Sequence, residues 1–289
     1  MVQDYVFPDS IPQAVSILAA GKGKARIIAG GTDLVLDIRD GKFSAETLVD
    51  LSNVEGLNRI EEVDGNISIG ANVTHTQIVK SELIQKHAPG LVDACRKIGS
   101  LQIRNVATVV GNVVTGNPAA DSAVALACLD TTATVVDING TRTVPFSEMY
   151  AGICLSCINS CCHIVTHLTF PKKQKGHGSA YLRMEQRNAL SLPMLNVSAK
   201  VSVVDNVFEW AQILIAPVGA GPQHAVDAEE FLKNMAVTNE NIKKAAVLAK
   251  NQAKFRSSSV RGSKEYRMGI LPVFVERVLH AALVDAIQA

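Results

Sequence analysis

The residues from Ala25 to Ile38 limit most strongly what this chain can fold into. A short apolar run over 26–29 predicts a buried strand, and the glycines at 30 and 31 allow a tight turn because they accept positive φ. Thr32 and Asp33 are common helix N-caps, so we expect a helix over 34–39. Such a strand, turn and helix N-terminus present free backbone N–H groups to an anion, usually a phosphate. The same residues also fit an ordinary turn with a helix cap.

Helix and strand patterns alternate around this stretch and predict a small α/β unit at the N-terminus. An amphipathic helix over 11–20, capped by Asp9 or Ser10, precedes the turn, and a strand over 47–51 follows it. Farther on, Asp64-Gly65 and Asn139-Gly140 are typical of type I′ hairpins. The other expected elements are helices over 74–86, 90–98, 123–129, 225–235, 240–253 and 264–287, strands over 132–138, 141–146, 180–186, 194–204 and 208–217, and a linker over 171–178.

Composition excludes several classes of protein. The 289 residues suffice for two or three compact units, and 47% apolar residues allow a substantial core. A net charge of +1 argues against a nucleic-acid-binding surface. No apolar run reaches the roughly 18 residues of a membrane span, and the N-terminus lacks the features of a signal peptide. We therefore expect a cytoplasmic protein that binds no nucleic acid and keeps its six cysteines reduced.

A second polar, glycine-containing segment covers residues 102–122. It is too rich in Gly, Asn, Thr and Pro for one regular element, yet its apolar content indicates burial, which is typical of a functional segment. Neither the Rossmann nor the P-loop fingerprint occurs. The two glycine segments could hold the two phosphates of a dinucleotide, with Asp121 accepting hydrogen bonds from a ribose hydroxyl or an adenine amine. Alternatively, both are connecting loops, and Asp121 or Ser122 only caps the next helix.

Three motifs, in this order, resemble the flavin-binding segments of the molybdenum hydroxylase family. They are Ala29-Gly30-Gly31-Thr32-Asp33-Leu34, Gln102-Ile103-Arg104-Asn105-Val106-Ala107-Thr108-Val109-Val110-Gly111-Asn112 and Asn117-Pro118-Ala119-Ala120-Asp121-Ser122. Tyr181-Leu182-Arg183 with Arg187, and Ser263-Lys264-Glu265-Tyr266-Arg267, fall where the family has similar segments. The resemblance spans essentially the whole chain and is greatest to the separate FAD-binding medium subunit of bacterial xanthine dehydrogenase-type enzymes.

The resemblance implies an α+β fold with two domains. Residues 1–173 would form a two-lobed FAD-binding domain of the vanillyl-alcohol oxidase (PCMH) type, with lobes over about 1–55 and 56–173. Residues 177–289 would form a smaller α+β domain of the CO dehydrogenase flavoprotein C-terminal type, with an antiparallel sheet and helices. FAD would lie extended between the two lobes.

The same resemblance implies which residues bind FAD. The first loop would hold the pyrophosphate, Asp121 would lie near the adenosine end, Val165 would contact the flavin, and Arg183 falls where relatives often have a Lys close to the ring. No residue is assigned as a general acid or base, and no metal ligand is expected. The complete predicted set is Ile28, Ala29, Gly30, Gly31, Thr32, Asp33, Leu34, Ala107, Thr108, Gly111, Asn112, Val114, Thr115, Ala120, Asp121, Val165 and Arg183.

In function, the resemblance implies an electron-transfer flavoprotein subunit. A molybdopterin-binding large subunit would hydroxylate an aromatic heterocycle such as a purine, and a small subunit with 2Fe-2S clusters would pass electrons to FAD here and on to NAD⁺ or another acceptor. The subunits would form a dimer of heterotrimers. The alternatives are a stand-alone flavin oxidoreductase and an FAD-free assembly or binding protein of the same fold.

Two departures from the family and a group of cysteines need separate treatment. Val110 replaces a glycine that the family usually has before Gly111-Asn112, and Arg183 keeps the charge of the usual Lys but not its shape. Cys154, Cys157, Cys161 and Cys162 have spacings that could hold zinc or an iron–sulfur cluster. They equally fit small buried hydrophobic residues in a loop that enters a strand, and we favour that interpretation.

Overall fold

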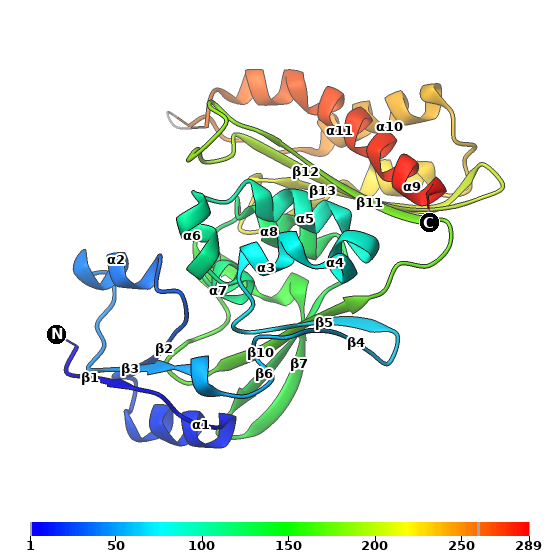
Figure 1. The fold of residues 1–289 in the computed structure, drawn as a ribbon. Helices are drawn as coiled ribbons and strands as arrows, with labels where there is room; N and C mark the ends of the chain where they lie inside the picture. The colour runs from blue at the N-terminus through cyan, green and yellow to red at the C-terminus, as the bar shows by residue number, and fades with distance from the viewer. Residues whose placement is uncertain (1, 259–260, 289) are drawn as a thin grey trace.

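Figure 1 shows the computed structural model, which describes residues 2–258 and 261–288. The N-terminal lobe is a three-stranded parallel sheet of β1 (Asp4–Val6), β2 (Ala25–Ile28) and β3 (Thr47–Asp50), in the order β1-β3-β2. Helix α1 (Ile11–Ala20) packs on one face and α2 (Leu34–Arg39) on the other. A short 3₁₀ helix, η1 (Leu51–Asn53), follows β3. Both predicted helices are confirmed at their predicted bounds, whereas β1 was not predicted.

Side chains on opposite faces of β3 pack against two different helices. Val49 belongs to the main core with Ala14 and Leu18 of α1, while Leu48 belongs to a small cluster that Leu34 of α2 packs against. Successive side chains of a strand point to opposite faces, so neighbouring residues meet different helices. Ser10 caps α1, since its side chain accepts a hydrogen bond from the N–H of Gln13.

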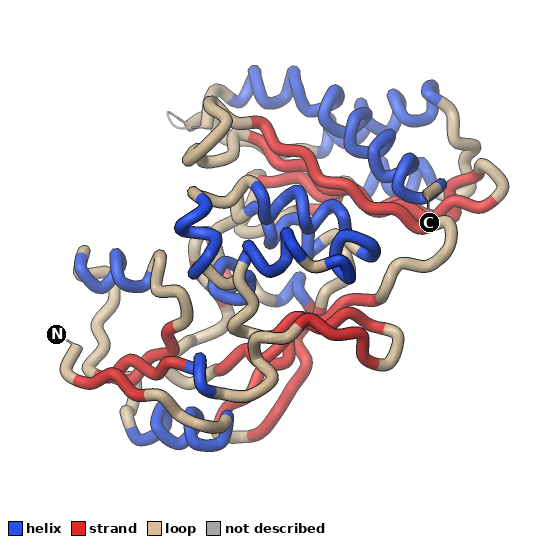
Figure 2. Tube along the Cα trace, viewed as in Figure 1, coloured by secondary structure: helices blue, strands red, loops and turns tan. Residues whose placement is uncertain are grey.

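The middle of the chain forms a five-stranded antiparallel sheet whose central strand, β10, comes last in sequence. The sheet has the order β4-β5-β10-β6-β7, and its strands are β4 (Ile60–Val63), β5 (Asn66–Gly70), β6 (Thr132–Asp137), β7 (Gly140–Pro145) and β10 (Ile164–Pro171). A register shift interrupts the β10–β6 pairing between Val165 and His167. Figure 2 shows the strands of this sheet in red beneath a layer of helices.

Both predicted hairpins are confirmed, but only one has the predicted turn. Asp64 and Gly65 have φ of 50° and 76° between the paired residues Val63 and Asn66, as type I′ requires. In the second hairpin Asp137 pairs with Gly140, and positive φ is confined to Gly140 among the described turn residues. The Asp137 carboxylate accepts the N–H of Asn139 at 2.7 Å, so an Asx turn replaces the expected type I′ turn.

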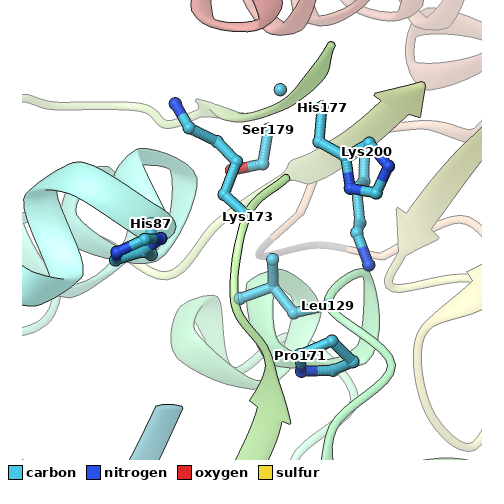
Figure 3. A pocket seen from close by; sticks show the side chains of 8 residues that line it. His87, Leu129, Pro171, Lys173, His177, Ser179 and Lys200 are labelled. Carbon is cyan, nitrogen blue, oxygen red and sulfur yellow. The ribbon is translucent and has the colours of Figure 1, made fainter. Parts of the chain in front are cut away.

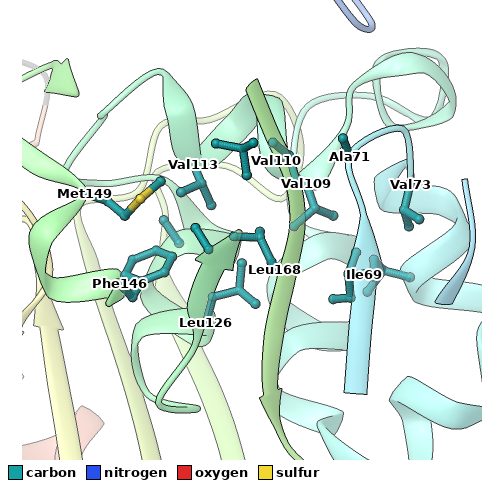
Figure 4. Packing of buried hydrophobic residues seen from close by; sticks show 14 of the residues in the cluster. Ile69, Ala71, Val73, Val109, Val110, Val113, Leu126, Phe146, Met149 and Leu168 are labelled. Atoms are coloured by element: carbon teal, nitrogen blue, oxygen red, sulfur yellow. The ribbon is translucent and has the colours of Figure 1, made fainter. Parts of the chain in front are cut away.

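Short helices cover one face of this sheet and form the middle layer of the molecule in Figure 1. They are α3 (His75–Lys80), α4 (Glu82–His87), α5 (Pro89–Arg96), α6 (Leu101–Val106), α7 (Val109–Val114) and α8 (Asp121–Ala127). The helix predicted over 74–86 is two helices, because Ser81 has an extended backbone and caps α4. Figure 4 shows Val109, Val113 and Leu168 in the core between helices and sheet.

The last third of the chain is an antiparallel sheet covered by helices. A 3₁₀ helix, η2 (Phe146–Glu148), and a small hairpin of β8 (Tyr150–Gly152) and β9 (Leu155–Ser156) precede β10. The sheet has the order β11-β12-β13-β14, with strands β11 (His177–Met184), β12 (Leu195–Val204), β13 (Val207–Ala216) and β14 (Gln223–His224). Helices α9 (Val226–Leu232), α10 (Asn239–Gln252) and α11 (Lys264–Ile287) cover it. The predicted meander and terminal helices are confirmed.

The predicted linker over 171–178 is shorter than expected. β10 ends at Pro171 and β11 begins at His177, so residues 172–176 connect the two strands. Gly178 lies in β11, where it pairs with Val201 of β12. Glycine is required there because α11 passes very close: a Cβ at Gly178 would lie 2.0 Å from the carbonyl oxygen of Ala282. No helix in the described part of the chain combines the length and apolar character needed to cross a membrane.

Candidate functional site

A cavity of about 1190 Å³ opens between the N-terminal lobe, the helical layer and the last domain. Drug-sized ligands occupy pockets of about 300–1,000 Å³, so this cavity has room for a larger molecule such as a dinucleotide. Every predicted binding residue lines it: Ile28, Ala29, Gly30, Gly31, Thr32, Asp33, Leu34, Ala107, Thr108, Gly111, Asn112, Val114, Thr115, Ala120, Asp121, Val165 and Arg183.

A second cavity, drawn in Figure 3, is far smaller. It lies where β10 passes into β11, and its walls include His87, Lys173, Ser179 and Lys200. Its volume of about 10 Å³ is close to the minimum for one water molecule. The large cavity is therefore the candidate site for an organic ligand.

The glycine loop lines the large cavity with backbone. A Cβ at Gly30 would lie 2.0 Å from the carbonyl oxygen of Val106, and Gly31 has a φ of +67°. Both positions therefore require glycine. Within residues 2–258 and 261–288, the N–H groups of Gly30, Gly31 and Thr32 donate no hydrogen bond. Unused N–H groups at the edge of a cavity can bind an anion.

Asp33 is the N-cap residue of α2, as one of the two predicted candidates, but its side chain does not cap the helix. Asp33 occupies the N-cap position with φ −100° and ψ −50°, and its side chain accepts no capping hydrogen bond. An N-cap residue normally has extended backbone, which aims its side chain at the helix N–H groups. At Asp33 the chain has already turned, because the N–H of Val35 donates to Gly31. Burial and the nearby Asp37 raise the pKa of Asp33.

The second glycine segment forms α6 and α7 and meets the first loop directly. Thr108 caps α7 by accepting the N–H of Gly111 at 3.0 Å. The Asn112 side chain accepts a hydrogen bond from the hydroxyl of Ser122 at 2.7 Å, which ties α7 to α8. Val110 lies in the first turn of α7 with negative φ and packs into the core, as Figure 4 shows. A side chain is therefore accommodated where the family usually has glycine.

Asp121 does not cap α8, contrary to one of our expectations. The N-cap residue is Ala120, and the Asp121 carboxylate is buried against Arg183 and Tyr181 instead. Arg183 Nη1 donates to the two carboxylate oxygens at 3.0 and 2.9 Å, and the Tyr181 hydroxyl also donates to this carboxylate. Burial raises the pKa of Asp121, and the nearby Arg183 and Tyr181 lower it by a smaller amount. A charge buried so deeply requires a paired cation.

This ion pair brings together two residues that we expected to lie apart along FAD. We expected Asp121 near the adenosine end of FAD and Arg183 near the flavin ring, but the two side chains are bonded and mark one place. Arg183 also donates to the carbonyl oxygen of Lys97 at 3.1 Å and to that of Ser191. Glu185 forms an ion pair with Arg183 at 2.8 Å. Arg183 therefore connects the helical layer to the last domain with several donors, which a Lys could not supply in the same geometry.

The cysteine-containing segment forms another wall of the cavity. Our interpretation of its four cysteines as small buried hydrophobic residues is wrong, because Cys154, Cys157 and Cys162 are exposed and Cys161 is half-buried. Cys154 is the turn residue between β8 and β9, with a φ of +54°. The carbonyl oxygen of Ser160 accepts the N–H of Ile27, and Arg26 Nη1 lies 3.5 Å from Cys161 Sγ, so the segment packs against β2. In the described residues, no three His, Cys, Asp or Glu side chains are grouped closely enough to hold a metal ion.

Several cavity residues were not predicted. Phe43 lies under the Arg26 guanidinium, whose carbon is 4.0 Å from the ring centroid, and residues 191–193 of the last domain also line the cavity. His75 is fully buried, and burial together with Arg104 lowers its pKa to about 4. The capping-box sequence from Thr74 to Gln77 indicates only where α3 begins. It does not indicate that His75 faces a cavity.

Comparisons with known proteins agree with this geometry. The sequence family described as "FAD binding domain in molybdopterin dehydrogenase" matches residues 1–173, and the "CO dehydrogenase flavoprotein C-terminal domain" matches residues 179–282. The chain belongs to the FAD-binding medium subunits of the molybdenum hydroxylases. Its fold is accordingly a two-lobed FAD-binding domain followed by the C-terminal domain of these flavoproteins.

Individual members of this family are similar over nearly their whole length. The 6-hydroxypseudooxynicotine dehydrogenase complex subunit alpha of Paenarthrobacter nicotinovorans is 30% identical, with 97% of this chain and 94% of the relative covered. The xanthine dehydrogenase FAD-binding subunit of Escherichia coli O157:H7 is 26% identical, covering 96% and 94%. A chain of reconstituted CO dehydrogenase from Oligotropha carboxidovorans superimposes with a TM-score of 0.91 at 26% identity, covering 99% of each chain.

The residues of the large cavity fit the FAD that the family name implies. The volume exceeds that of a drug-sized pocket, as a dinucleotide requires. The loop requires glycine at 30, because the Val106 backbone lies close, and at 31, because φ is positive. It therefore presents backbone to the cavity, with unused N–H donors that suit a diphosphate. Val165, Val114 and Ile28 add apolar wall, which suits an aromatic ring system.

Proposed function

We propose that this chain holds FAD in the large cavity and serves as the electron-transfer flavoprotein subunit of a multi-subunit molybdenum hydroxylase. The observation that supports this most directly is that both glycine segments, Val165 and Arg183 line one cavity. FAD supplies the redox chemistry when bound. The chain's own residues bind it, orient it and exclude water from it.

Each wall of the cavity has a proposed part in binding. The N–H groups of Gly30, Gly31 and Thr32 donate to the diphosphate, because no group of the described chain uses them. Val165, 5% exposed on β10, contacts the flavin as an apolar residue. The Asp121–Arg183 pair closes the cavity against the last domain. Protein acid–base chemistry is not part of the proposal, since electron transfer through FAD needs none from this chain.

The proposed partners follow from the family. A molybdopterin-binding large subunit hydroxylates the substrate, and a small subunit with 2Fe-2S clusters passes the electrons to this chain. We propose that the other redox centres lie on these partner chains. We propose a dimer of heterotrimers in the cytoplasm. The size of the native complex, measured by mass photometry, tests this assembly.

The finer proposal is an enzyme of the xanthine dehydrogenase type that transfers electrons to NAD⁺. Two relatives are named for the oxidation of nitrogen heterocycles, 6-hydroxypseudooxynicotine and xanthine. Reduction of NAD⁺ by the purified complex, compared with an artificial electron acceptor and with purine and pyridine substrates, tests acceptor and substrate together. Turnover with the artificial acceptor but not with NAD⁺ would contradict the NAD⁺ proposal and leave the flavoprotein role intact.

The domain division is proposed at the short connection over residues 172–176. Two large apolar clusters support it, one that lies mainly before the connection and one that lies after it. We infer an FAD-binding domain over 1–173 and a C-terminal domain over 177–289.

The decisive experiment is flavin binding by the full chain. We expect purified protein, or apo-protein mixed with FAD, to show the visible absorption bands of bound flavin with one FAD per chain. A colourless protein that takes up no FAD would overturn the proposed function and favour an FAD-free binding protein. Catalytic turnover by this chain alone would favour a stand-alone oxidoreductase.

A further inference from the structure

His75 is a buried cavity residue that the proposed function leaves without a part. It is the first residue of α3, its side chain is fully buried, and it lines the large cavity. Its Nε2 has no hydrogen-bond partner among the described residues. An unpaired buried nitrogen is unfavourable, so its position at a cavity wall indicates a partner that enters the cavity.

Contacts on the other side of the imidazole fix its orientation. Nδ1 lies 3.4 Å from Sγ of the buried Cys95. Burial raises the pKa of the Cys95 thiol well above its usual value, so the S–H remains and can donate to Nδ1. The ring is neutral, because burial and Arg104 lower the pKa of His75 to about 4. We assign the ring proton to Nε2, as is required when the Cys95 thiol donates to Nδ1, and Nε2 is then a neutral donor.

The position of His75 places this donor next to the proposed FAD-binding loops. The backbone N–H of His75 donates to the carbonyl oxygen of Ala107 at 3.1 Å, and Thr74 pairs with Thr108. Gly30 packs on the same segment, since its Cβ would meet Val106 and Ala107. His75 therefore lies next to the point where the two glycine segments meet.

We propose that His75 is a cofactor-positioning residue whose Nε2–H donates a hydrogen bond to an oxygen of bound FAD. This inference rests on the proposed function. A donor fixed by Cys95 at the meeting point of the two loops sets how deeply FAD enters the cavity. Among the described histidines, one other ring nitrogen is buried without a partner. It is Nδ1 of His87, a residue that lines the small cavity of Figure 3.

The test compares three substitutions in the full chain. His75→Leu fills the buried space without a donor, His75→Gln keeps an amide N–H near the position of Nε2, and His87→Leu removes a matched unpaired nitrogen outside the large cavity. The Kd of each apo-protein for FAD is measured by flavin fluorescence. In parallel, the ¹⁵N resonances of histidine-labelled wild type are recorded before and after FAD addition, with His75 assigned by its absence from His75→Leu.

We expect His75→Leu to raise the Kd for FAD about tenfold, as loss of one hydrogen bond predicts, while His75→Gln and His87→Leu stay near wild type. The Nε2 resonance of His75 shifts when FAD binds. Equal FAD affinity in His75→Leu and wild type, or an unmoved Nε2 resonance, would overturn the inference while leaving the proposed function standing. If wild type itself binds no FAD, the proposed function fails first.

Discussion

The two ends of the large cavity are built in opposite ways. At the glycine loop, the wall is backbone, and the N–H groups of Gly30, Gly31 and Thr32 have no partner in the described chain. At the Asp121–Arg183 end, the wall is side chain, and the opposite charges satisfy each other. The difference shows that an open set of donors is available for a ligand, whereas a closed ion-pair network holds the protein together. Sequence motifs alone do not separate these two roles.

The largest expected effect comes from breaking the closed network. Arg183→Met should lower the free energy of unfolding by about 3–5 kcal/mol, because the buried Asp121 carboxylate loses its paired cation. Urea unfolding of the apo-protein measures this. Lys24→Met is the matched control, since it breaks the exposed Lys24–Glu46 pair and should cost less than about 1 kcal/mol. Equal effects of both substitutions would mean that Arg183 does not stabilise the domain contact.

A pH series tests whether the cavity wall at His75 is as strongly buried as the structure indicates. Folding lowers the pKa of His75 from 6.5 to about 4, so the unfolded chain binds the proton more readily. His75 therefore does not reduce the free energy of unfolding above pH 6.5. As the pH falls from 6.5 towards 4, protonation of the unfolded chain lowers the free energy of unfolding by about 3 kcal/mol. Urea unfolding at several pH values should show a shallower loss in His75→Leu than in wild type. Parallel curves would contradict the buried neutral imidazole.

The smallest expected effect concerns the glycine loop, whose N–H groups have no partner in the described chain. Gly31→Val should lower FAD affinity about tenfold while the chain stays folded, because valine is strained at positive φ and its Cβ would lie 3.2 Å from Val35 Cγ2. Gly41→Val is the control: Gly41 has a φ of +73°, and nothing lies within 4 Å of its added Cβ. FAD titration and far-UV circular dichroism measure both. Normal FAD affinity in Gly31→Val would mean that the loop is only a turn.

Local chemistry made much of the fold predictable. Asp64-Gly65 gave the hairpin because positive φ at two residues favours one turn, and the spacing of Ala14, Val15 and Leu18 gave α1. The first glycine segment was predictable because Gly30 and Gly31 are required by a close backbone contact and by a positive φ. All such signals lie within a few residues of the structure that they predict.

Long-range contacts were not predictable in this way. Asp121 was a plausible cap from its neighbours, yet its partner is Arg183, 62 residues away. His75 carries no sequence signal for a cavity, since Cys95 and Ala107 reach it only through the packing of α3, α5 and α6. The second hairpin was found with the wrong turn, because the Asp137 side chain competes with the backbone pattern.

The place of β10 in the sheet determines when this protein can acquire its cavity. β10 is the central strand, paired with β5 on one side and β6 on the other, yet it is the last of the five to leave the ribosome. Until residue 171 has emerged, this sheet exists in the nascent chain only as the separate hairpins β4–β5 and β6–β7, and isolated hairpins are marginally stable in water. Val165, on β10 itself, reaches the cavity at the same moment. Cofactor loading must therefore follow translation of more than half of the polypeptide.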